Sequence, residues 1–317
     1  MPQTSNKANG LYYCDPPYKD ANKYPNPASS KGLQNPNMRG IRYGIFWSLL
    51  QTAGNKESID YEYFDDAIAA ASGAGKLCYF QTPAGLFTPD WFFELEGAIK
   101  YVTLDGRMQV PWCPVFQKYW NNLHRTLAPR YKTNPALKFV VMSGQGQQIE
   151  SFFASKPEEV ETATQLALDS GYPTLRAAWV TGSKKVLDNY MAAWEPLPIQ
   201  IVTGQPWQGQ DGTDAQQELF DYGRTTYGNR FGASNHGLTD KEPKAGQPGA
   251  TIIEQCSGCD ATGYESHNAM ETSARLDAQL DNARNWGANV IAVWKSDADN
   301  NANASVLKTH NDALMAQ

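Results

Sequence analysis

The stretch LKFVVMSGQGQQIES, residues 137–151, indicates the fold more directly than any other part of the chain. Residues 137–143 form a nearly continuous apolar run, which is typical of a strand buried on both faces within a parallel sheet. A glycine-rich loop follows the run and carries one carboxylate, Glu150. We therefore expect a strand that delivers a candidate acidic residue just beyond its carboxyl end.

The same arrangement recurs on either side of this stretch. An amphipathic helix is predicted over 113–131, because Phe116, Trp120, Leu123 and Leu127 fall on one stripe at helical spacing. Further helices are predicted near 59–75, 156–194, 214–228 and 267–285, with another at the end of the chain. Strands are predicted from about residue 39 and at 76–81, 107–112, 137–143, 199–204, 230–234, 250–255 and 288–294.

Buried strands that alternate with helices predict an α/β fold with a parallel sheet. Their number and the length of 317 residues favour a (β/α)8 TIM barrel, a single domain over 39–317, behind an irregular N-terminal arm at 1–38. A doubly wound open sheet is the alternative. It is disfavoured because no glycine-rich nucleotide fingerprint follows any predicted strand.

Composition excludes several classes of partner. The formal net charge is -6, so the chain has no basic footprint for nucleic acid. No apolar run approaches the length of a membrane span, and the first thirty residues lack the pattern of a signal peptide. Localisation stays open, since a mature secreted or virion-associated chain would look the same, and oligomeric state cannot be predicted.

Cysteine and histidine spacing predicts neither a metal site nor a cofactor. The five cysteines are an odd number, so at least one is unpaired within the chain. The CSGC motif at 256–259 could supply half of a zinc site, but no second ligand pair has suitable spacing. A disulfide or two free thiols are the remaining readings of this motif.

In a barrel of this type the active site lies at the carboxyl ends of the strands. The residues there are rich in aromatic rings and amides, which suit the C–H faces and hydroxyl groups of sugars, although such aromatics are often core residues. The candidate substrate-binding residues are Trp47, Gln81, Gln145, Gln148, Gln205, Trp207, Asn235, His236, Gln255 and Trp294.

Two glutamates, Glu150 and Glu254, are the candidate catalytic residues. Glycosidic bonds are cleaved by two carboxyl groups, one that protonates the leaving oxygen and one that attacks or activates water. Each also has a structural alternative. Glu254 could pair with Lys295 or Arg42 inside the barrel, and Glu150 could be a solvated loop residue.

Residues 44–150 resemble the β-galactosidase-like family 42 branch of the clan A glycoside hydrolases. The resemblance is carried by GIFW at 44–47, by QTPAGLFTPDW at 81–91, and by the segment RYKTNP that precedes the strand and its VVMSG ending at 140–144. It implies a retaining glycosidase with its acid/base after the fourth strand and its nucleophile on the seventh.

Carried onto this chain, the resemblance assigns the nucleophile to Glu254 and sugar-facing positions to Trp47 and Trp294. Ser143 and Gly144 stand where family members have Asn-Glu, so the acid/base role passes to Glu150. We therefore expect a retaining glycoside hydrolase that acts on an oligo- or polysaccharide. The alternative is a catalytically silent barrel that binds polysaccharide, possibly within a cell-surface or virion assembly.

Overall fold

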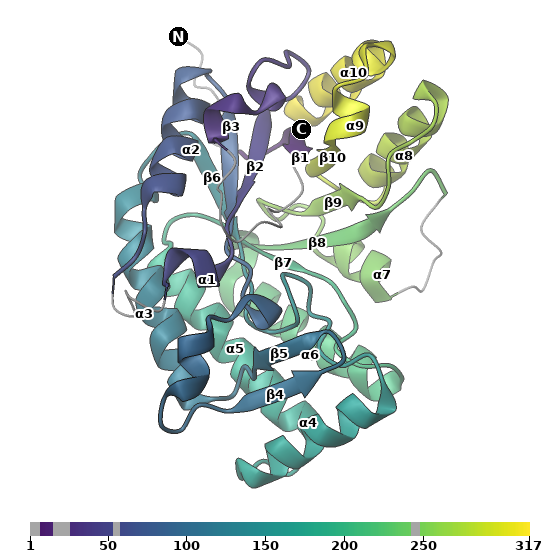
Figure 1. Ribbon diagram of the computed structural model, residues 1–317. Coiled ribbons are helices and arrows are strands. Elements are labelled where there is room, and N and C mark those ends of the chain that lie inside the picture. Colours follow the sequence, from purple (N-terminus) through teal and green to yellow (C-terminus); the bar gives the residue numbers. More distant parts are fainter. Residues whose placement is uncertain (1–6, 15–25, 53–57, 242–247) are drawn as a thin grey trace.

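The computed structural model describes residues 7–14, 26–52, 58–241 and 248–317. Eight parallel strands close into a barrel in the order β1-β10-β9-β8-β7-β6-β3-β2. Helices surround the barrel, and a small two-stranded sheet lies outside it (Figure 1). The predicted (β/α)8 barrel is therefore confirmed.

The elements have the following bounds. The barrel strands are β1 Gly10–Cys14, β2 Gly40–Gly44, β3 Leu77–Gln81, β6 Leu137–Val141, β7 Ile199–Val202, β8 Phe231–Leu238, β9 Gly263–Ser266 and β10 Val290–Trp294; the outer hairpin is β4 Lys100–Thr103 and β5 Gly106–Gln109. The α-helices are α1 Trp47–Leu50, α2 Glu62–Gly73, α3 Pro114–Tyr131, α4 Pro157–Asp169, α5 Leu175–Ala193, α6 Gln210–Tyr227, α7 Pro248–Gln255, α8 Ser273–Asn285, α9 Lys295–Ala298 and α10 Ala304–Met315. Short 3-10 helices span Pro27–Ser29, Lys31–Leu33, Gly85–Phe87, Asp90–Glu94, Gly228–Arg230 and Asn301–Asn303.

The prediction of a wholly irregular arm at 1–38 is wrong. Its segment GLYYC is β1, which pairs with β10 along all five residues and with β2 at Tyr12 and Tyr13, so the first barrel strand lies inside this arm. The segment is too short for its own sequence to distinguish a strand from a loop, and its pairing partner lies at the far end of the chain. Residues 1–6 and 15–25 of the predicted arm lie outside the described residues.

Two other strand predictions are also wrong. Residues 107–109 belong to β5 of the outer hairpin, and residues 250–255 belong to helix α7. In α7 the side chains of Ile252 and Ile253 are buried while Glu254 and Gln255 are exposed, as on a helix that covers the barrel. A short apolar run fits a strand or a buried helix equally well, which explains the error. The seventh barrel strand is instead β9.

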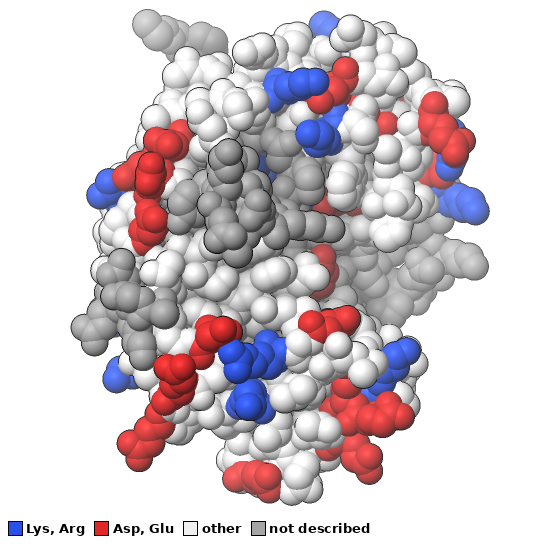
Figure 2. Space-filling model, viewed as in Figure 1, with Lys and Arg blue, Asp and Glu red and all other residues white. Residues whose placement is uncertain are grey.

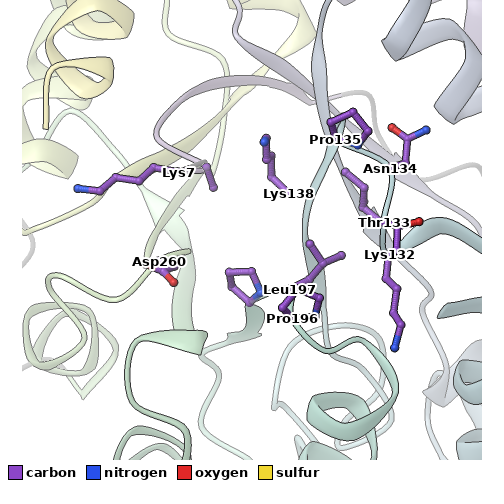
Figure 3. A pocket seen from close by; sticks show the side chains of 12 residues that line it. Lys7, Lys132, Thr133, Asn134, Pro135, Lys138, Pro196, Leu197 and Asp260 are labelled. Carbon is purple, nitrogen blue, oxygen red and sulfur yellow. The ribbon is translucent and has the colours of Figure 1, made fainter. Parts of the chain in front are cut away.

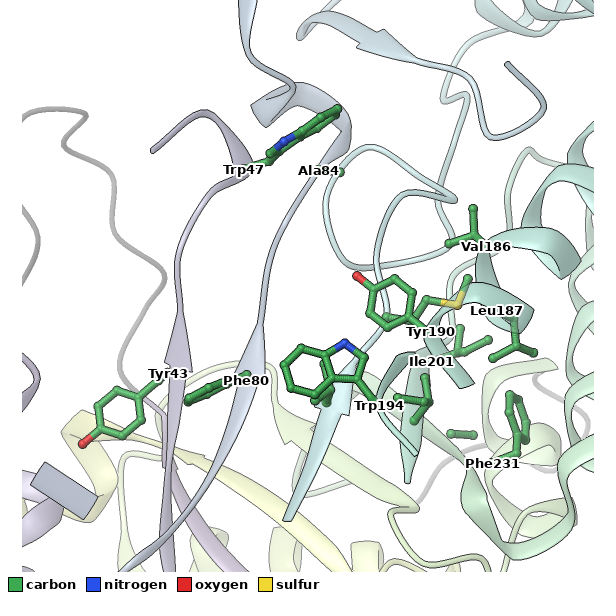
Figure 4. Packing of buried hydrophobic residues seen from close by; sticks show 14 of the residues in the cluster. Tyr43, Trp47, Phe80, Ala84, Val186, Leu187, Tyr190, Trp194, Ile201 and Phe231 are labelled. Atoms are coloured by element: carbon green, nitrogen blue, oxygen red, sulfur yellow. The ribbon is translucent and has the colours of Figure 1, made fainter. Parts of the chain in front are cut away.

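Two layers of apolar side chains hold the barrel together. Inside it, Tyr79 stacks on Phe139 at a centroid distance of 4.4 Å, and Tyr12 meets both rings edge-on. Outside it, a larger core fills the space between strands and helices, and Figure 4 shows Tyr190 and Trp194 of this layer near Ile201 of β7.

The surface shows no single dominant charge on the face seen in Figure 2. Lysine and arginine side chains lie there in small groups, interspersed with aspartate and glutamate. Among the described residues, none of the helices has both the length and the hydropathy that crossing a bilayer requires.

Candidate active site

Glu150 lies at the carboxyl end of the barrel, beside the end of β7. In the ladder between β6 and β7, Val141 pairs with Gln200, so the next inward position would pair Ser143 with Val202. Glu150 instead makes this bridge with Val202, and the Ser151 amide donates to the Val202 carbonyl at 3.2 Å. The loop after β6 thus leaves the barrel and returns, which places Glu150 where Ser143 would otherwise stand.

The glycines and glutamines of this loop serve its own packing. A side chain at Gly146 would overlap the Glu150 carbonyl oxygen, and Gly144 has φ +102 with Phe116 against it. The Gln145 amide donates to the Ile149 carbonyl at 3.0 Å. These contacts hold in place the segment that carries Glu150. The glycines and Gln145 therefore pack within the loop, although the sequence suggested that loop residues such as Gln145 contact a ligand.

A second buried carboxylate, Glu265, lies on β9. In the strand GYES, Tyr264 packs into the outer core, so Glu265 points into the lumen. There it accepts a hydrogen bond from the Arg42 guanidinium of β2 at 2.6 Å. The side chains of Arg42 and Glu265 are 3% and 9% exposed.

His236 bridges the two carboxylates. Its Nδ1 lies 3.1 Å from Glu150 Oε1, and its Nε2 lies 3.6 Å from Glu265 Oε2. The register between β8 and β9 shifts between Asn235 and Leu238, where β8 holds one residue more than its partner. Such a bulge re-aims side chains, and it contains His236.

The bridge sets the charge of the three groups. Burial lowers the pKa of His236, but the charge of Glu265 and the hydrogen bond to Glu150 outweigh it and raise this pKa above its ordinary value. Burial likewise raises the pKa of Glu150, yet the hydrogen bond from His236 brings it below its ordinary range. For Glu265, burial is again outweighed, here by Arg42 and His236, so its pKa is lowered. The favoured state is an imidazolium between two carboxylates.

The separation of the two carboxylates suits hydrolysis of a glycosidic bond. One imidazole ring joins Glu150 and Glu265, so their nearest oxygens are at most about 9 Å apart, an upper limit that admits the separations of both retaining and inverting pairs. The Glu150 side chain is 34% exposed, so this carboxylate is open to a ligand from solvent.

Glu254 does not take part in this arrangement. It lies at the end of α7 and is exposed, next to Gln255, whose side chain accepts from Gln217 of α6. The following Cys256 carbonyl accepts from Thr262, just before β9 begins, so Glu254 stands toward the amino-terminal end of the barrel. The carboxylate that the structure places on the seventh strand is Glu265.

The predicted tryptophans differ in their surroundings. Trp47 is fully buried among Trp91 and Trp120, and its indole donates to Gln51, so it is a core residue here. Trp207 is 4% exposed and packs edge-on against Trp179. Only Trp294 is partly exposed, at the end of β10 with its indole donating to the Ser266 carbonyl beside Glu265.

Among the predicted polar ligands, His236 is the one that the structure brings to both carboxylates. The Asn235 side-chain amide donates to the Thr203 hydroxyl at 2.8 Å, and the Gln205 side-chain amide donates to the Gly209 carbonyl at 2.6 Å. Both side chains therefore stabilise the segments that follow β7 and line β8. Gln148 is exposed on the loop before Glu150. Gln81, at the end of β3, is 1% exposed, and neither polar atom of its side chain has a hydrogen-bond partner within the described part of the chain. Gln255 lies with Glu254, away from the site.

The described residues contain no site suited to metal binding or to cysteine-based catalysis. All five cysteines are buried, and Cys256 and Cys259 of the CSGC motif are free thiols. Over the same residues, no three histidine, cysteine or acidic side chains are grouped as metal ligands would be.

Sequence reasoning missed Glu265 and assigned Arg42 only a structural role. The available signal was the alternation of side chains between two faces in GYES, where Tyr264 is followed by the polar Glu265. This four-residue stretch follows the turn-rich segment CSGCDAT. Four residues are too few for alternation to stand out, and the longer segment ATIIEQ at 250–255, with its apolar centre, was predicted as the strand instead. The pairing of β9 with β8 and β10 is what makes this segment a strand.

Comparison with known sequences gives one partial match. A β-galactosidase from Arthrobacter sp is 31% identical over 162 residues, which are 47% of this chain and 22% of that protein. The chain therefore spans about a fifth of the length of this curated relative. No family model matches the chain.

Solved structures show the same fold over nearly the whole chain. The catalytic domain of a β-amylase from Paenibacillus polymyxa matches with a TM-score of 0.65 at 9% identity, covering 95% of this chain and 96% of that one. A β-galactosidase from Marinomonas ef1 matches with a TM-score of 0.60 at 13% identity, over 97% of this chain and 62% of that one. The chain thus shares the barrel architecture of these glycoside hydrolases.

Proposed function

We propose that this protein is a glycoside hydrolase in which Glu150 and Glu265 form the catalytic pair. The observation that carries the proposal is the His236 bridge between one carboxylate after the fourth barrel strand and another on the seventh. The fold shared with β-amylase and β-galactosidases, and the partial match to a β-galactosidase, support the same class of reaction.

Glu265 is suited to act as the nucleophile of a retaining mechanism. Arg42 holds it ionised and fixes its orientation, and its buried position on a strand restricts its motion. Attack on the anomeric carbon would form a glycosyl ester and release the leaving oxygen, and water would later hydrolyse that ester.

Glu150 is suited to act as the acid/base, with His236 as its proton source. The lowered pKa of Glu150 means that the resting proton sits on the imidazole. When Glu265 becomes a neutral ester, His236 loses one of its two anionic neighbours and holds its proton less tightly. As this charge is lost during the attack, the proton passes through Glu150 to the leaving oxygen in the same step, and Glu150 later accepts a proton from the attacking water.

Three matched variants test this assignment. Glu150→Gln, Glu265→Gln and the exposed control Glu254→Gln would be assayed on aryl glycosides, with β-galactosides as the first probe, and on polysaccharides. We expect Glu265→Gln to abolish hydrolysis and Glu150→Gln to slow it by about 10² to 10⁴ fold. The Glu150→Gln loss should shrink with dinitrophenyl leaving groups, which need no protonation. Glu254→Gln should match the wild type.

Product stereochemistry tests the retaining mechanism separately. Proton NMR of the first product formed should show the anomeric configuration of the substrate, and inversion would assign Glu265 as a base toward water instead. Circular dichroism spectra of each variant establish that it is folded. Full activity of both Glu150→Gln and Glu265→Gln would contradict the proposed pair.

A polysaccharide-binding barrel without activity is the second candidate. It is favoured by the lowered pKa of Glu150, since a resting general acid usually has a raised pKa. Saturable binding of a polysaccharide by the wild type, with no hydrolysis of any probe, would support this candidate.

A further inference from the structure

A cavity lies at the opposite end of the barrel from Glu150 and Glu265. It has a volume of about 600 Å³ and is lined where strands begin, by Ala8 ahead of β1, Leu137 of β6, Pro198 ahead of β7 and Asp260 ahead of β9. This volume falls within the range of about 300 to 1,000 Å³ that is usual for small-molecule sites.

The walls of the cavity are mainly apolar and stiff. Pro135 lies on one side, and Pro196, Leu197 and Pro198 line another (Figure 3). Proline rings have little conformational freedom to lose when a ligand covers them. Such walls suit the flat or ring-shaped apolar body of a small molecule.

The three lysines in the lining differ in their hydrogen bonds. Lys7 donates to the Gln317 carbonyl and Lys132 to the Ala193 carbonyl, each at 3.1 Å. Lys138, on β6 and half-buried, has no hydrogen-bond or ion-pair partner among the described residues. Burial, together with the charge of Arg39, lowers the pKa of Lys138, so a like charge is close to it.

The one carboxylate of the lining does not neutralise Lys138. Burial raises the pKa of Asp260, and the charge that opposes this rise is that of Lys7. Figure 3 shows Lys138 between Lys7 and Pro135, on the other side of the cavity from Asp260. Lys138 therefore lines the cavity as a partly desolvated cation without a counter-charge among the described residues, and an anion would stabilise it.

We propose that this cavity binds a small organic anion, whose ring or apolar body packs on the prolines while its phosphate or carboxylate group contacts Lys138. The site is separate from the proposed catalytic pair, so neither proposal depends on the other.

The test measures the thermal unfolding of the full chain with phenyl phosphate, at constant ionic strength. We expect a saturable rise of roughly 4 °C at about 100 times the dissociation constant. Benzyl alcohol, which has the ring without the charge, and inorganic phosphate, which has the charge without the ring, should each give a much smaller rise.

Matched variants locate the effect. Lys138→Met should abolish the rise, Lys138→Arg should keep it, and Lys100→Met, which removes an exposed charge on β4, should leave it unchanged. Should Lys138→Met fail to fold, Lys138→Gln removes the charge and keeps a polar side chain, and it should likewise abolish the rise. The absence of a saturable rise in the wild type, or an equal rise with inorganic phosphate, would overturn the proposal. Either result leaves the catalytic proposal untouched.

Discussion

At the scale of single residues, His236 decides the charge state of the site. It lies between Glu150 and Glu265, and its side chain is only 15% exposed. Without a cation there, two carboxylates near each other would raise one another's pKa. The histidine therefore keeps both ionised while holding the proton that the first step of the proposed hydrolysis would need.

A pH titration tests this role of His236. The raised pKa of His236 means that its protonation stabilises the fold fully below about pH 6.5 and that this contribution is lost as the pH rises through the folded-state pKa. The stability advantage of the wild type over His236→Asn, from urea unfolding, should therefore shrink as the pH rises through that folded-state value.

Proton NMR of the histidine rings gives an independent reading of the same titration. The His236 signal should titrate above the ordinary range. His124 is the internal control, since burial lowers its pKa to about 3 and its signal should stay constant near neutral pH. A His236 signal that titrates at or below the ordinary value would contradict the imidazolium bridge.

At the scale of elements, the fit of β9 between its neighbours positions Glu265. A side chain at Gly263 would lie 1.7 Å from the Val290 carbonyl oxygen of β10, so only glycine allows the strands to approach this closely. The backbone of β9 cannot shift without also moving Glu265, two residues further along.

Replacement of Gly263 by alanine tests this positioning. We expect Gly263→Ala to reduce the free energy of unfolding by about 1 to 3 kcal/mol, as overpacking does, and to lower kcat along with it. Gly73→Ala is the control, because nothing lies within 4 Å of the added carbon at the end of α2. That variant should keep full activity and gain up to about 1 kcal/mol. Equal behaviour of the two variants in urea unfolding would refute the argument.

At the scale of the whole molecule, the pair of Arg42 and Glu265 joins two strands that are not neighbours. In the closed order, β1 and β10 lie between β2 and β9, so the hydrogen bond spans the lumen. A buried charge without its partner is costly, and this pair therefore couples the two sides of the barrel.

Arg42→Met should destabilise the protein by about 3 to 5 kcal/mol at neutral pH, because it leaves Glu265 charged and buried. The double variant Arg42→Met with Glu265→Gln should recover much of the loss. With Arg42 present, the lowered pKa of Glu265 contributes stability above its unfolded-state pKa, which is lost as the pH falls through the folded-state pKa. Without Arg42 the ionised Glu265 carboxylate destabilises the fold. The loss of unfolding free energy in Arg42→Met should therefore become smaller at a pH low enough to protonate Glu265.

Lys308→Met is the control for this change of charge. It removes an exposed partner of Asp312 on α10, and such surface pairs contribute little to stability. Urea unfolding at pH 7 and pH 5 measures all four proteins. A double variant no more stable than Arg42→Met would show that the arginine acts through packing and not through Glu265.

By itself, the sequence determined the fold class and pointed to Glu150, one carboxylate of the proposed pair. The helix α3 and the strands β3, β6, β7 and β10 follow from local apolar patterns, and those patterns depend only on neighbours along the chain. Glu150 and His236 were predicted as site residues because each follows or ends such a strand.

The tertiary structure alone decided the rest. The strands β1 and β9 are short and acquire their form by pairing with β10, a contact between distant parts of the chain. Glu150 reaches the edge of the barrel because it forms a β-bridge with Val202 of β7. Glu265 is recognised as a site residue because barrel closure places Arg42 opposite it across the lumen. Local patterns carry no information on such long-range contacts, which is why Glu254 was predicted in place of Glu265.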